Sequence, residues 1–532
     1  MSLLRSIVED SRASCKAEVP ATDPGGSGPP RSTDIERSIH EQVRSILEFL
    51  KEPDPSRSFD VVERGLVPRL FALGQLFLAF FLAWRHERSN SAVRAWTRRG
   101  LRRRQAQPRT LKTFFGPVRY WRTYMTDDAV SGLYPLDLAL GLTADCFSLL
   151  VVDIAARLPT VLSYDQATAI FELFVGWAPS KTAVEQMVLG LGQHTQDWFR
   201  DAPPPADDGE VLVIQIDSKA TPTATEEELQ KRRGKRRPSA FPDSPRHRGR
   251  EARQRRGSKV RRKKGDKSKN GRAAHLVVMY TLKRGTGPDG KPALLGPRNR
   301  WVYASYTSKR HAFEIARREA DKRGFPKGSG KLIQLVTDGD DDLRRLGKEF
   351  FPDAIHTLDV MHALEYLWEA GGCLFKEGCA ELTAWVKSLE KLIYKGKILD
   401  VLGEMGERLE RIPKTGPGNK GRRKRLETAI NYLGSRTEMM NYGWLKKQDL
   451  ELASGSVEGA VKHVIAKRFD SGSMRWIRER AEPLLQLRSI EINGDWSAFI
   501  RYVHARANEQ AVRDAQPVVL LSRLAGPLPE VA

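Results

Sequence analysis

The chain uses little cysteine, and its cysteines lack the spacing of a structural zinc site. Its 532 residues contain four of them, none in a CxxC pair: Cys15, Cys146, Cys373 and Cys379. Sparse cysteine in a long chain argues against a disulfide-stapled secreted fold and is typical of a reducing compartment. The first residues mix acidic and basic side chains where a signal peptide would have an apolar run. We therefore expect a cytoplasmic protein with ordinary thiols.

Long apolar runs are also scarce. The segment Leu70–Trp84 is the one run that approaches the length of a membrane span. Gln75 interrupts it, Arg69 precedes it, and it is shorter than the roughly 20 apolar residues that a bilayer requires. We therefore predict a buried core helix from about Val61 to Trp84, and no membrane partner.

Acidic residues are outnumbered by basic ones. The chain has 89 Lys and Arg residues against 66 Asp and Glu, which gives a formal net charge of +23. The surplus Lys and Arg side chains repel one another unless a polyanion neutralises them. Nucleic acid is such a polyanion, and its binding is favoured further by the release of its counterions. The length is sufficient for roughly two to four domains. The sequence therefore favours a multidomain protein that binds nucleic acid.

The basic residues are most concentrated in a polar insertion at residues 225–272. This stretch has no apolar period, so we predict an arm that is unfolded by itself. Such an arm would neutralise DNA phosphates without reading bases. The predicted DNA-binding residues of the arm are Lys231, Arg232, Arg233, Arg255, Arg256, Arg261, Arg262, Lys263 and Lys264.

The N-terminal part contains two further candidate DNA-binding features. Apolar and aromatic residues on both sides of Gly116 predict a hairpin within Thr110–Tyr124, which is either a DNA-facing β element or a solvated ribbon. Ser163 begins a helix that ends at Gly176, and a second helix follows Ser180. This pair is either a helix-turn-helix that contacts DNA or an ordinary helical hairpin.

After residue 210 the pattern changes to short apolar runs that alternate with helical periods. The predicted strands and helices follow the order β-β-β-α-β-α-β-α. That order is the RNase H-like topology, a mixed sheet in an α/β fold. The strands then stop, and an all-helical insertion follows before the helix at Ser454–Phe469. A mainly helical N-terminal domain precedes the sheet.

Three carboxylates in this arrangement predict a divalent metal site. Asp217 is expected to end the first strand and Asp338 the fourth, and these strands would lie side by side in the centre of the sheet. Glu458, on the helix after the insertion, would close the site. Phosphodiester chemistry needs such converging carboxylates because hard divalent cations prefer oxygen ligands. The predicted catalytic and metal-binding triad is therefore Asp217, Asp338 and Glu458.

Alternative acidic residues remain open at two of these positions. Asp340, Asp341 and Asp342 compete with Asp338, although a helix N-terminus attracts acidic residues for dipole reasons alone. Glu451 and Glu365 compete with Glu458, the least constrained of the three.

The expected organisation has six parts along the chain. They are a flexible tail (1–33), a helical DNA-binding region with a small hairpin (34–200), the first part of the RNase H-like domain (210–375), a helical insertion (376–450), the catalytic helix with the end of that domain (451–500) and a C-terminal tail (501–532).

Four segments carry a resemblance to a known family. They are VIQIDSK, LVTDGDDDLR, HTLDVMHALEYLW and SGSVEGAVKHVIAKRF. These segments resemble the catalytic blocks of bacterial insertion-sequence transposases of the ISKra family, which have a DDE-type catalytic domain. The resemblance implies the triad Asp217, Asp338 and Glu458, with Mg²⁺ as the ion and Mn²⁺ as a substitute. It also places Asp359 and His362 as accessory residues in a D-x-x-H pattern.

The sequence departs from the family pattern at two places. The stretch after the hairpin is MTDDAVSG, which lacks the cysteine pair of many relatives. Ile465 stands where many triad enzymes have a base seven residues after the Glu, and Lys462 is the nearest base on the same helix face, either as a DNA-phosphate ligand or as a solvated side chain.

The resemblance implies a DNA transposase that binds the ends of its own element, cleaves DNA and joins the ends to target DNA. A homodimer is expected because two ends must be joined, and the protein would associate with the nucleoid when bound to DNA. Two alternatives remain: another RNase H-like nuclease that cuts without joining, and a catalytically silent, transposase-derived DNA-binding protein.

Overall fold

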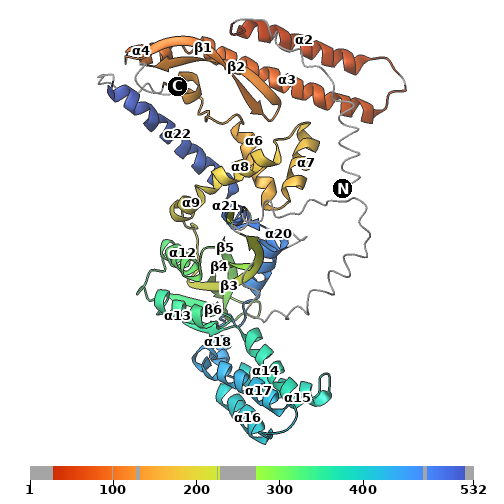
Figure 1. Cartoon of the computed structure of the whole chain (residues 1–532), viewed down its shortest axis with the longest axis vertical. Helices are drawn as coiled ribbons and strands as arrows, with labels where there is room; N and C mark the ends of the chain where they lie inside the picture. The colour runs from red at the N-terminus through yellow and green to blue at the C-terminus, as the bar shows by residue number, and fades with distance from the viewer. Residues whose placement is uncertain are drawn as a thin grey trace. The chain divides into compact units, whose positions relative to one another are not determined.

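A computed structural model describes residues 28–521, except 55, 99, 127–131, 225, 228–229, 231–270 and 471–475. The chain forms two compact units, one made of residues 1–194 with 496–532 and the other of residues 195–495. Each unit is described by itself (Figure 1). Most of the predicted N-terminal tail, and the nine predicted DNA-binding residues of the basic arm, lie outside the described residues.

The first unit begins with an antiparallel pair of long helices, α2 (Ser32–Lys51) and α3 (Phe59–Glu87). Ile35 and Ile46 are buried at the contact, as their helical spacing predicts. The Ser58 side chain accepts a hydrogen bond from the backbone N–H of Val61 and so caps α3.

The prediction that this second helix is a buried core helix is wrong. α3 has an 18-residue window of mean hydropathy 1.9, yet only 6% of that window is buried. The reason is that, among the described residues, the extensive contacts of α3 are with α2 and with the β1–β2 hairpin, and these leave part of its surface open. Within the described part of the chain, α3 is the one helix long and apolar enough to cross a membrane by length and composition.

The predicted hairpin is confirmed and is longer than its sequence pattern indicates. Strands β1 (Arg102–Thr113) and β2 (Gly116–Thr126) pair antiparallel around a turn at Phe114 and Phe115. Asp137 is buried beneath the hairpin, where it accepts hydrogen bonds from Arg109 Nη1 at 2.8 Å and from Tyr120 Oη at 2.7 Å. A buried carboxylate needs such partners, so this network is structural.

Short helices complete the first unit. They are α4 (Asn90–Arg98), α5 (Pro135–Ala139), α6 (Leu149–Arg157), the 3₁₀ turn η1 (Leu158–Thr160), α7 (Tyr164–Val175) and α8 (Lys181–Gly192). The predicted capping box at Ser163 and Gln166 is present at the start of α7. The C-terminal stretch, predicted as a tail, is instead helical to Leu521 in α22 (Trp496–Leu521). Trp496 anchors its start, because the indole Nε1 donates to Asp153 at 2.5 Å.

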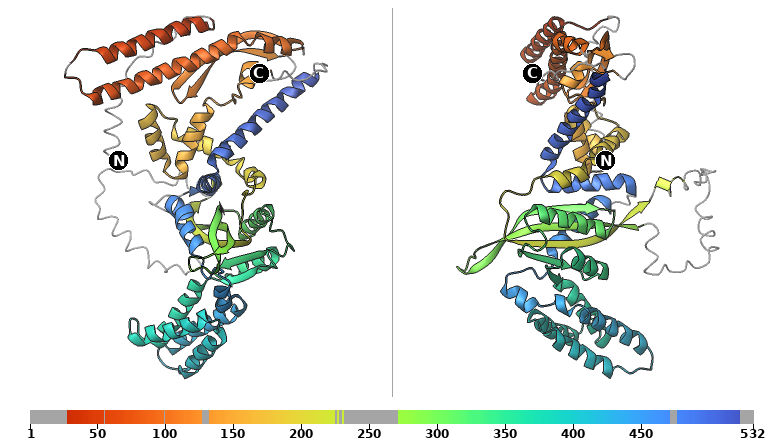
Figure 2. Two further views of the ribbon diagram at one scale, coloured as in Figure 1. Left: turned by 180° about the vertical axis from the view of Figure 1, so that it is seen from behind. Right: turned by 90° about the vertical axis from the view of Figure 1, so that its left-hand side faces the viewer.

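The second unit is a mixed α/β structure built on one sheet (Figure 2). Its elements, after α9 (Thr195–Asp201), are β3 (Val211–Ala224), β4 (Gly271–Thr286), β5 (Pro292–Ser305), α12 (Lys309–Lys322), β6 (Leu332–Thr337), α13 (Asp341–Phe350), β7 (Ile355–Leu358) and α14 (Val360–Leu374). The predicted order β-β-β-α-β-α-β-α is confirmed. The strands lie in the order β5-β4-β3-β6-β7. β4 is antiparallel to β3 and β5, whereas β6 is parallel to β3 and β7.

The expectation that Asp217 ends the first strand is wrong. β3 continues for seven more residues to Ala224, because residues after Ser218 pair with the beginning of β4, down to Pro222 opposite Gly271. The polar side chains of this extension hide it from an apolar pattern. Thr221, for example, is buried and its hydroxyl lies 2.9 Å from Tyr306 Oη.

Between β7 and the end of the unit the chain is almost entirely helical. The elements are α15 (Ala380–Tyr394), α16 (Ile398–Arg411), α17 (Asn419–Gly434), η3 (Thr437–Met439), α18 (Tyr442–Lys447), α19 (Gly455–Ala460), the π-helical turn η4 (Val461–Ala466), α20 (Lys467–Phe469), β8 (Trp476–Ile477) and α21 (Arg478–Ile492). The basic stretch Lys414–Arg425, predicted as a loop, enters α17 at Asn419.

Candidate metal centre

Three aspartates lie at the same level of three neighbouring parallel strands. Gln215 of β3 is opposite Val336 of β6, so two residues further along this register Asp217 stands beside Asp338. Thr337 and Leu358 are opposite each other in β6 and β7, so the next step places Asp338 beside Asp359. Residues that are opposite each other in parallel strands point to the same face of a sheet. Asp338 and Asp359 directly follow the last residues of β6 and β7, so the register, continued past the paired residues, directs all three carboxylates to one edge of the sheet.

Gln215 connects this edge to the helix that carries Glu458. Its side-chain oxygen accepts a hydrogen bond from Val457 N at 2.9 Å, and its amide nitrogen lies 3.4 Å from the carbonyl oxygen of Ala453. Gln215 is fully buried and lies two residues before Asp217, hence on the same face of β3. The backbone immediately before Glu458 is thereby fixed next to Asp217.

Gln334 and Asp359 hold the chain that leads into α19. Gln334 exchanges two hydrogen bonds with the backbone of Glu451, at 3.0 Å and 2.7 Å. Asp359 Oδ2 accepts from the backbone N–H of Ser454 at 3.1 Å and also from its hydroxyl. These contacts explain how Glu458 reaches the sheet after an inserted helical region. Ser454 precedes α19 but does not cap it with its side chain, because its hydroxyl binds Asp359.

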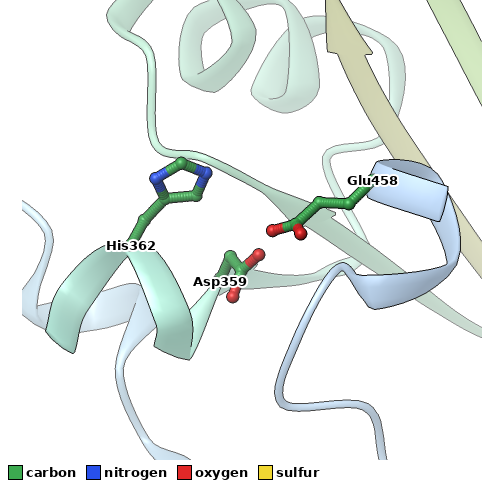
Figure 3. Close-up of side chains that lie close together, drawn as sticks. All are labelled: Asp359, His362 and Glu458. Atoms are coloured by element: carbon green, nitrogen blue, oxygen red, sulfur yellow. The ribbon is translucent and has the colours of Figure 1, made fainter. Parts of the chain in front are cut away.

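Asp359, His362 and Glu458 form a compact group of candidate metal ligands (Figure 3). One ligand atom from each lies within 4.8 Å of the others. Asp359 is the N-cap of α14, since its Oδ1 accepts from Met361 N at 2.7 Å, and His362 lies in the first turn. His362 Nδ1 is 3.2 Å from Glu365 Oε2, which favours a proton on Nδ1 and leaves Nε2 as the free acceptor.

The electrostatics link this group to the other two aspartates. The pKa of Asp217 is raised, chiefly because burial disfavours its charged form. The backbone N–H of Ser218 opposes that shift, the negative charges of Asp338 and Glu458 add to it, and His362 opposes it. The charges of Asp338, His362 and Glu458 therefore all act on the pKa of Asp217.

The helical insertion clamps the loop that follows β6. Tyr432 Oη donates to the carbonyl oxygen of Asp338, and Arg436 Nε donates to that of Gly339 at 2.8 Å. Arg436 Nη2 also donates to Asp341 at 3.0 Å. Gly339 has φ +76°, and a Cβ there would lie 2.9 Å from Arg436 Nε, so a side chain would disturb the clamp. The insertion thus positions Asp338.

The competing acidic residues near Asp338 have other partners. Asp340 caps α13 by accepting from the N–H groups of Asp342 and Leu343, and pairs with Lys309 at 2.6 Å. Asp341 pairs with Arg436. Their roles are structural, as the helix-terminus explanation predicts.

The two alternatives to Glu458 differ in position. Glu451 accepts from Tyr280 Oη at 2.9 Å, and its backbone lies beside Gln334, four residues before Asp338 and so about 13 Å away along the strand. Glu365 contacts His362 but is largely exposed on α14. Glu458 is the one of the three that the structure brings against both His362 and Asp359.

Lys462 lies in the π-helical turn η4, one turn after Glu458, and is exposed. A π-helical turn inside a helix is uncommon and often accompanies a functional site. The structure gives Lys462 an exposed position in the turn that follows Glu458.

Sequence reasoning missed the residues that position the site, above all Gln215 and Gln334. Both stand inside otherwise apolar strands, in VLVIQID and LIQLVTD, and both are fully buried. A buried amide needs hydrogen-bond partners. A glutamine inside an apolar strand segment therefore indicates that another part of the chain binds to it. The partners themselves, in 451–457, could not be named from sequence.

The donor set fits a divalent cation. Of the predicted triad, only Glu458 belongs to the group whose ligand atoms lie within 4.8 Å of one another, together with Asp359 and His362. Asp217 and Asp338 are not members of that group, although the charges of Asp338 and Glu458 act on Asp217. Carboxylate oxygens suit Mg²⁺ and Mn²⁺, and a histidine nitrogen suits Mn²⁺ or Zn²⁺ better. Asp359 already accepts three hydrogen bonds, so it serves as an anchor and can offer a remaining lone pair. No protein-family model and no curated protein matches the chain, so the function has to be argued from this geometry.

Proposed function

We propose that the chain is a DNA transposase whose second unit is an RNase H-like catalytic domain dependent on a divalent cation, Mg²⁺ in the first place. The observation that carries the proposal is the register that aligns Asp217 with Asp338 next to the helix of Glu458. Three carboxylates converging on one sheet edge are the arrangement that metal-dependent phosphodiester chemistry requires.

The sheet supports the proposed fold family. Three antiparallel strands are followed by two parallel ones, in the order β5-β4-β3-β6-β7, with the carboxylates on the two central neighbours β3 and β6. An all-helical insertion between β7 and α19 agrees with the ISKra-like blocks in the sequence. Fold likeness alone does not assign an activity, so the site has to carry it.

The proposed chemistry is attack of an oxygen on a DNA phosphorus. Water attacks first, the P–O3′ bond breaks, and a 3′-hydroxyl and a 5′-phosphate result. That 3′-hydroxyl then attacks a target phosphorus, the target's own P–O3′ bond breaks, and the target 3′-hydroxyl leaves. A divalent cation, when bound, would supply a Lewis acid that activates the attacking oxygen and offsets phosphate charge. Asp217, Asp338 and Glu458 would hold the cation, and Asp359 holds Ser454 and thus the approach of α19. His362, with Glu365 against Nδ1, can bind a phosphate oxygen or take up a proton at Nε2.

The net charge of +23 supports DNA as the partner, because DNA phosphates neutralise positive side chains that otherwise repel one another. A second candidate is an RNase H-like nuclease that cuts without joining, which the same carboxylates would serve. A third is a silent DNA-binding descendant, which would keep the positive charge without use of the carboxylates.

One experiment separates the three. The full chain is incubated with Mg²⁺, a donor DNA that carries the coding sequence with its native flanks, and a supercoiled target. Joined products identify a transposase, cleavage without joining a nuclease, and binding alone a silent protein. The double variant Asp217→Asn/Asp338→Asn is the matched control, and the proposal predicts that it binds DNA but forms no product. Products from that variant would refute the site.

A further inference from the structure

An unusual amount of apolar surface is exposed on the first two described helices. Of the eighteen large hydrophobic side chains that are exposed in the described part of the chain, nine lie in α2 or α3. Seven of them are 37–50% exposed, and six of these form two rows, Val43, Leu47 and Leu50 on α2 and Leu70, Phe77 and Phe81 on α3. Monomeric proteins seldom leave such a set uncovered unless it is an interaction site.

Each row is a stripe along one helix face. At about 100° per residue, Val43, Leu47 and Leu50 fall within about 60° of one another around α2. Leu70, Phe77 and Phe81 fall within about 40° around α3 by the same measure. A straight apolar stripe is what a partner helix needs.

On α3 the stripe lies between the two faces that are already packed. The α2 side of α3 is marked by Gly65, which lies against Phe49, and by Arg69, whose carbonyl accepts from Gln42. The hairpin side is marked by Gln75, which donates to the carbonyl of Pro117. Phe115 of the hairpin turn also packs against Gly74, which lies between Leu70 and Phe77 on the helix surface. It leaves Leu70, Phe77 and Phe81 about half exposed.

The two stripes lie on the same side of the helix pair. On each helix, the exposed row is rotated from the α2–α3 contact face by roughly a quarter turn around the helix axis. The rotation has the same sense on both helices when each is followed from its N-terminus. In an antiparallel pair, equal rotation from the contact face leads to the same side. The stripes therefore join into one apolar face on α2 and α3, next to the side of α3 whose Leu78 and Leu82 pack on the β1–β2 hairpin.

The face has the size of half a dimer interface. Six half-exposed side chains present on the order of 500 Å², and flanking groups bring this towards the roughly 800 Å² per partner of a stable interface. Two such helix pairs facing each other would form a four-helix bundle, in which each stripe is covered by an identical one.

The charges around α3 favour a second copy in antiparallel orientation. If a twofold axis passes midway between Leu70 and Phe77, Leu70 lies against Phe77 of the partner subunit. The same axis places Glu63 opposite Trp84 of the partner subunit, beside the partner's Arg85. Arg88, whose guanidinium lies 4.2 Å over the Trp84 ring, reinforces the positive charge at that end. Acidic and basic ends therefore meet.

The helix charges disfavour a lipid surface. Helices that bind anionic membranes are rich in Lys and Arg on their polar face. α2 has four acidic residues, Asp34, Glu36, Glu41 and Glu48, against the three basic residues Arg37, Arg44 and Lys51.

We propose that the apolar face formed by Val43, Leu47, Leu50, Leu70, Phe77 and Phe81 is the surface through which two copies of this chain associate as a four-helix bundle. The surface is independent of the metal chemistry, and its test uses neither DNA nor a cation.

The first test measures the mass of the full chain by sedimentation velocity at micromolar concentration. The unchanged chain is expected to be a dimer, and Leu70→Gln/Phe77→Gln a monomer with an unchanged circular dichroism spectrum, because both side chains are about half exposed. The matched control is Phe174→Gln on α7, which replaces a side chain that is 70% exposed and should leave the dimer intact. A monomeric unchanged chain, or a dimer that survives the double substitution, overturns the proposal.

The second test checks the orientation by disulfide formation. Leu70→Cys and Phe77→Cys are made separately, with the unchanged chain as control for its own four cysteines. Under mild oxidation the mixture is expected to cross-link, because residues 70 and 77 face each other across the axis. Each variant alone is expected not to, since identical positions are about 10 Å apart along the helices, beyond disulfide reach.

Cross-linking of each variant alone, but not of the mixture, would contradict the antiparallel bundle. Flotation of the chain with phosphatidylglycerol vesicles, lost in Leu70→Gln/Phe77→Gln without a change of mass, would assign the face to lipid and also overturn the proposal.

Discussion

The side-chain oxygen of Gln215 accepts a hydrogen bond from the backbone N–H of Val457 at 2.9 Å. These residues are 242 positions apart, and each lies within two residues of a proposed metal ligand, Asp217 or Glu458. The bond therefore fixes α19, the helix that follows the insertion, relative to the central strand β3. Catalytic carboxylates have to be held within about half an ångström, which side chains such as this one secure.

We predict that Gln215→Leu lowers DNA cleavage about 10- to 100-fold, because Val457 N–H then keeps only the carbonyl of Ser454 in its own turn and the tie between Glu458 and the sheet is lost. Gln215→Glu, which keeps an acceptor oxygen, is expected to retain more activity. Cleavage rates are compared with melting temperatures of both variants. Equal activity of Gln215→Leu and the unchanged chain would show that this bond does not position the site.

Asp217→Asn is expected to abolish cleavage and to raise the melting temperature of the cation-free protein. Burial and the nearby charges of Asp338 and Glu458 raise the pKa of Asp217, so its ionised form is destabilising in the folded state. Excess Mg²⁺ should raise the melting temperature of the unchanged chain more than that of the variant. A variant that melts lower without cation would contradict the charge repulsion.

His275 gives a second pH dependence, which comes from a lowered pKa rather than from a raised one as in Asp217. Burial, with a smaller contribution from Lys309, lowers its pKa to about 4 from 6.5, and its Nδ1 lies 2.7 Å from Ser218 Oγ. The unfolded chain therefore binds more protons than the folded one between these values, so this residue makes the free energy of unfolding fall as pH drops from about 6.5 to 4. His275→Gln should reduce that slope in urea titrations at pH 7 and pH 5. An unchanged slope would mean that His275 is not held neutral.

Tyr432→Phe removes one bond to the Asp338 backbone and keeps the ring stacked on Tyr366, whose centroid is 3.7 Å away. We expect cleavage to fall several-fold, about the effect of one lost positioning bond, with little change in stability. Tyr366→Phe is the matched control and should be close to unchanged. If both variants behave alike, the insertion does not act on Asp338 through this hydroxyl.

The strands could be predicted because their signals are local, whereas of the predicted triad only Glu458 belongs to the group of candidate ligands that the structure brings together. The short apolar runs VLVIQID and LIQLVTD predict strands, and the helical periods between such runs give the order of strands and helices along the chain. The extension of β3 to Ala224 could not be predicted because its polar residues pair across the intervening insertion. The exposure of α3 was hidden for a related reason, since apolarity predicts burial but does not say whether the partner belongs to the same chain.

The position of Glu458 shows the limit most clearly. The sequence offers Glu451, Glu458 and Glu365 as third ligands, and only the contacts of Gln215, Gln334 and Asp359 separate them. Hydrogen bonds between residues far apart in the chain produce no periodic pattern in the sequence. The buried glutamines mark where partners are needed but not which segment supplies them.

The most direct test of the metal centre compares Glu458→Gln with Glu451→Gln in Mg²⁺-dependent cleavage of DNA. Glu458→Gln keeps the size of the side chain but removes the charge that binds a hard cation, so cleavage is expected to fall at least about 100-fold, with partial recovery in Mn²⁺. Glu451→Gln can still accept from Tyr280 and should cleave nearly normally. A chain that cleaves normally with Glu458→Gln and fails with Glu451→Gln would contradict the proposed centre.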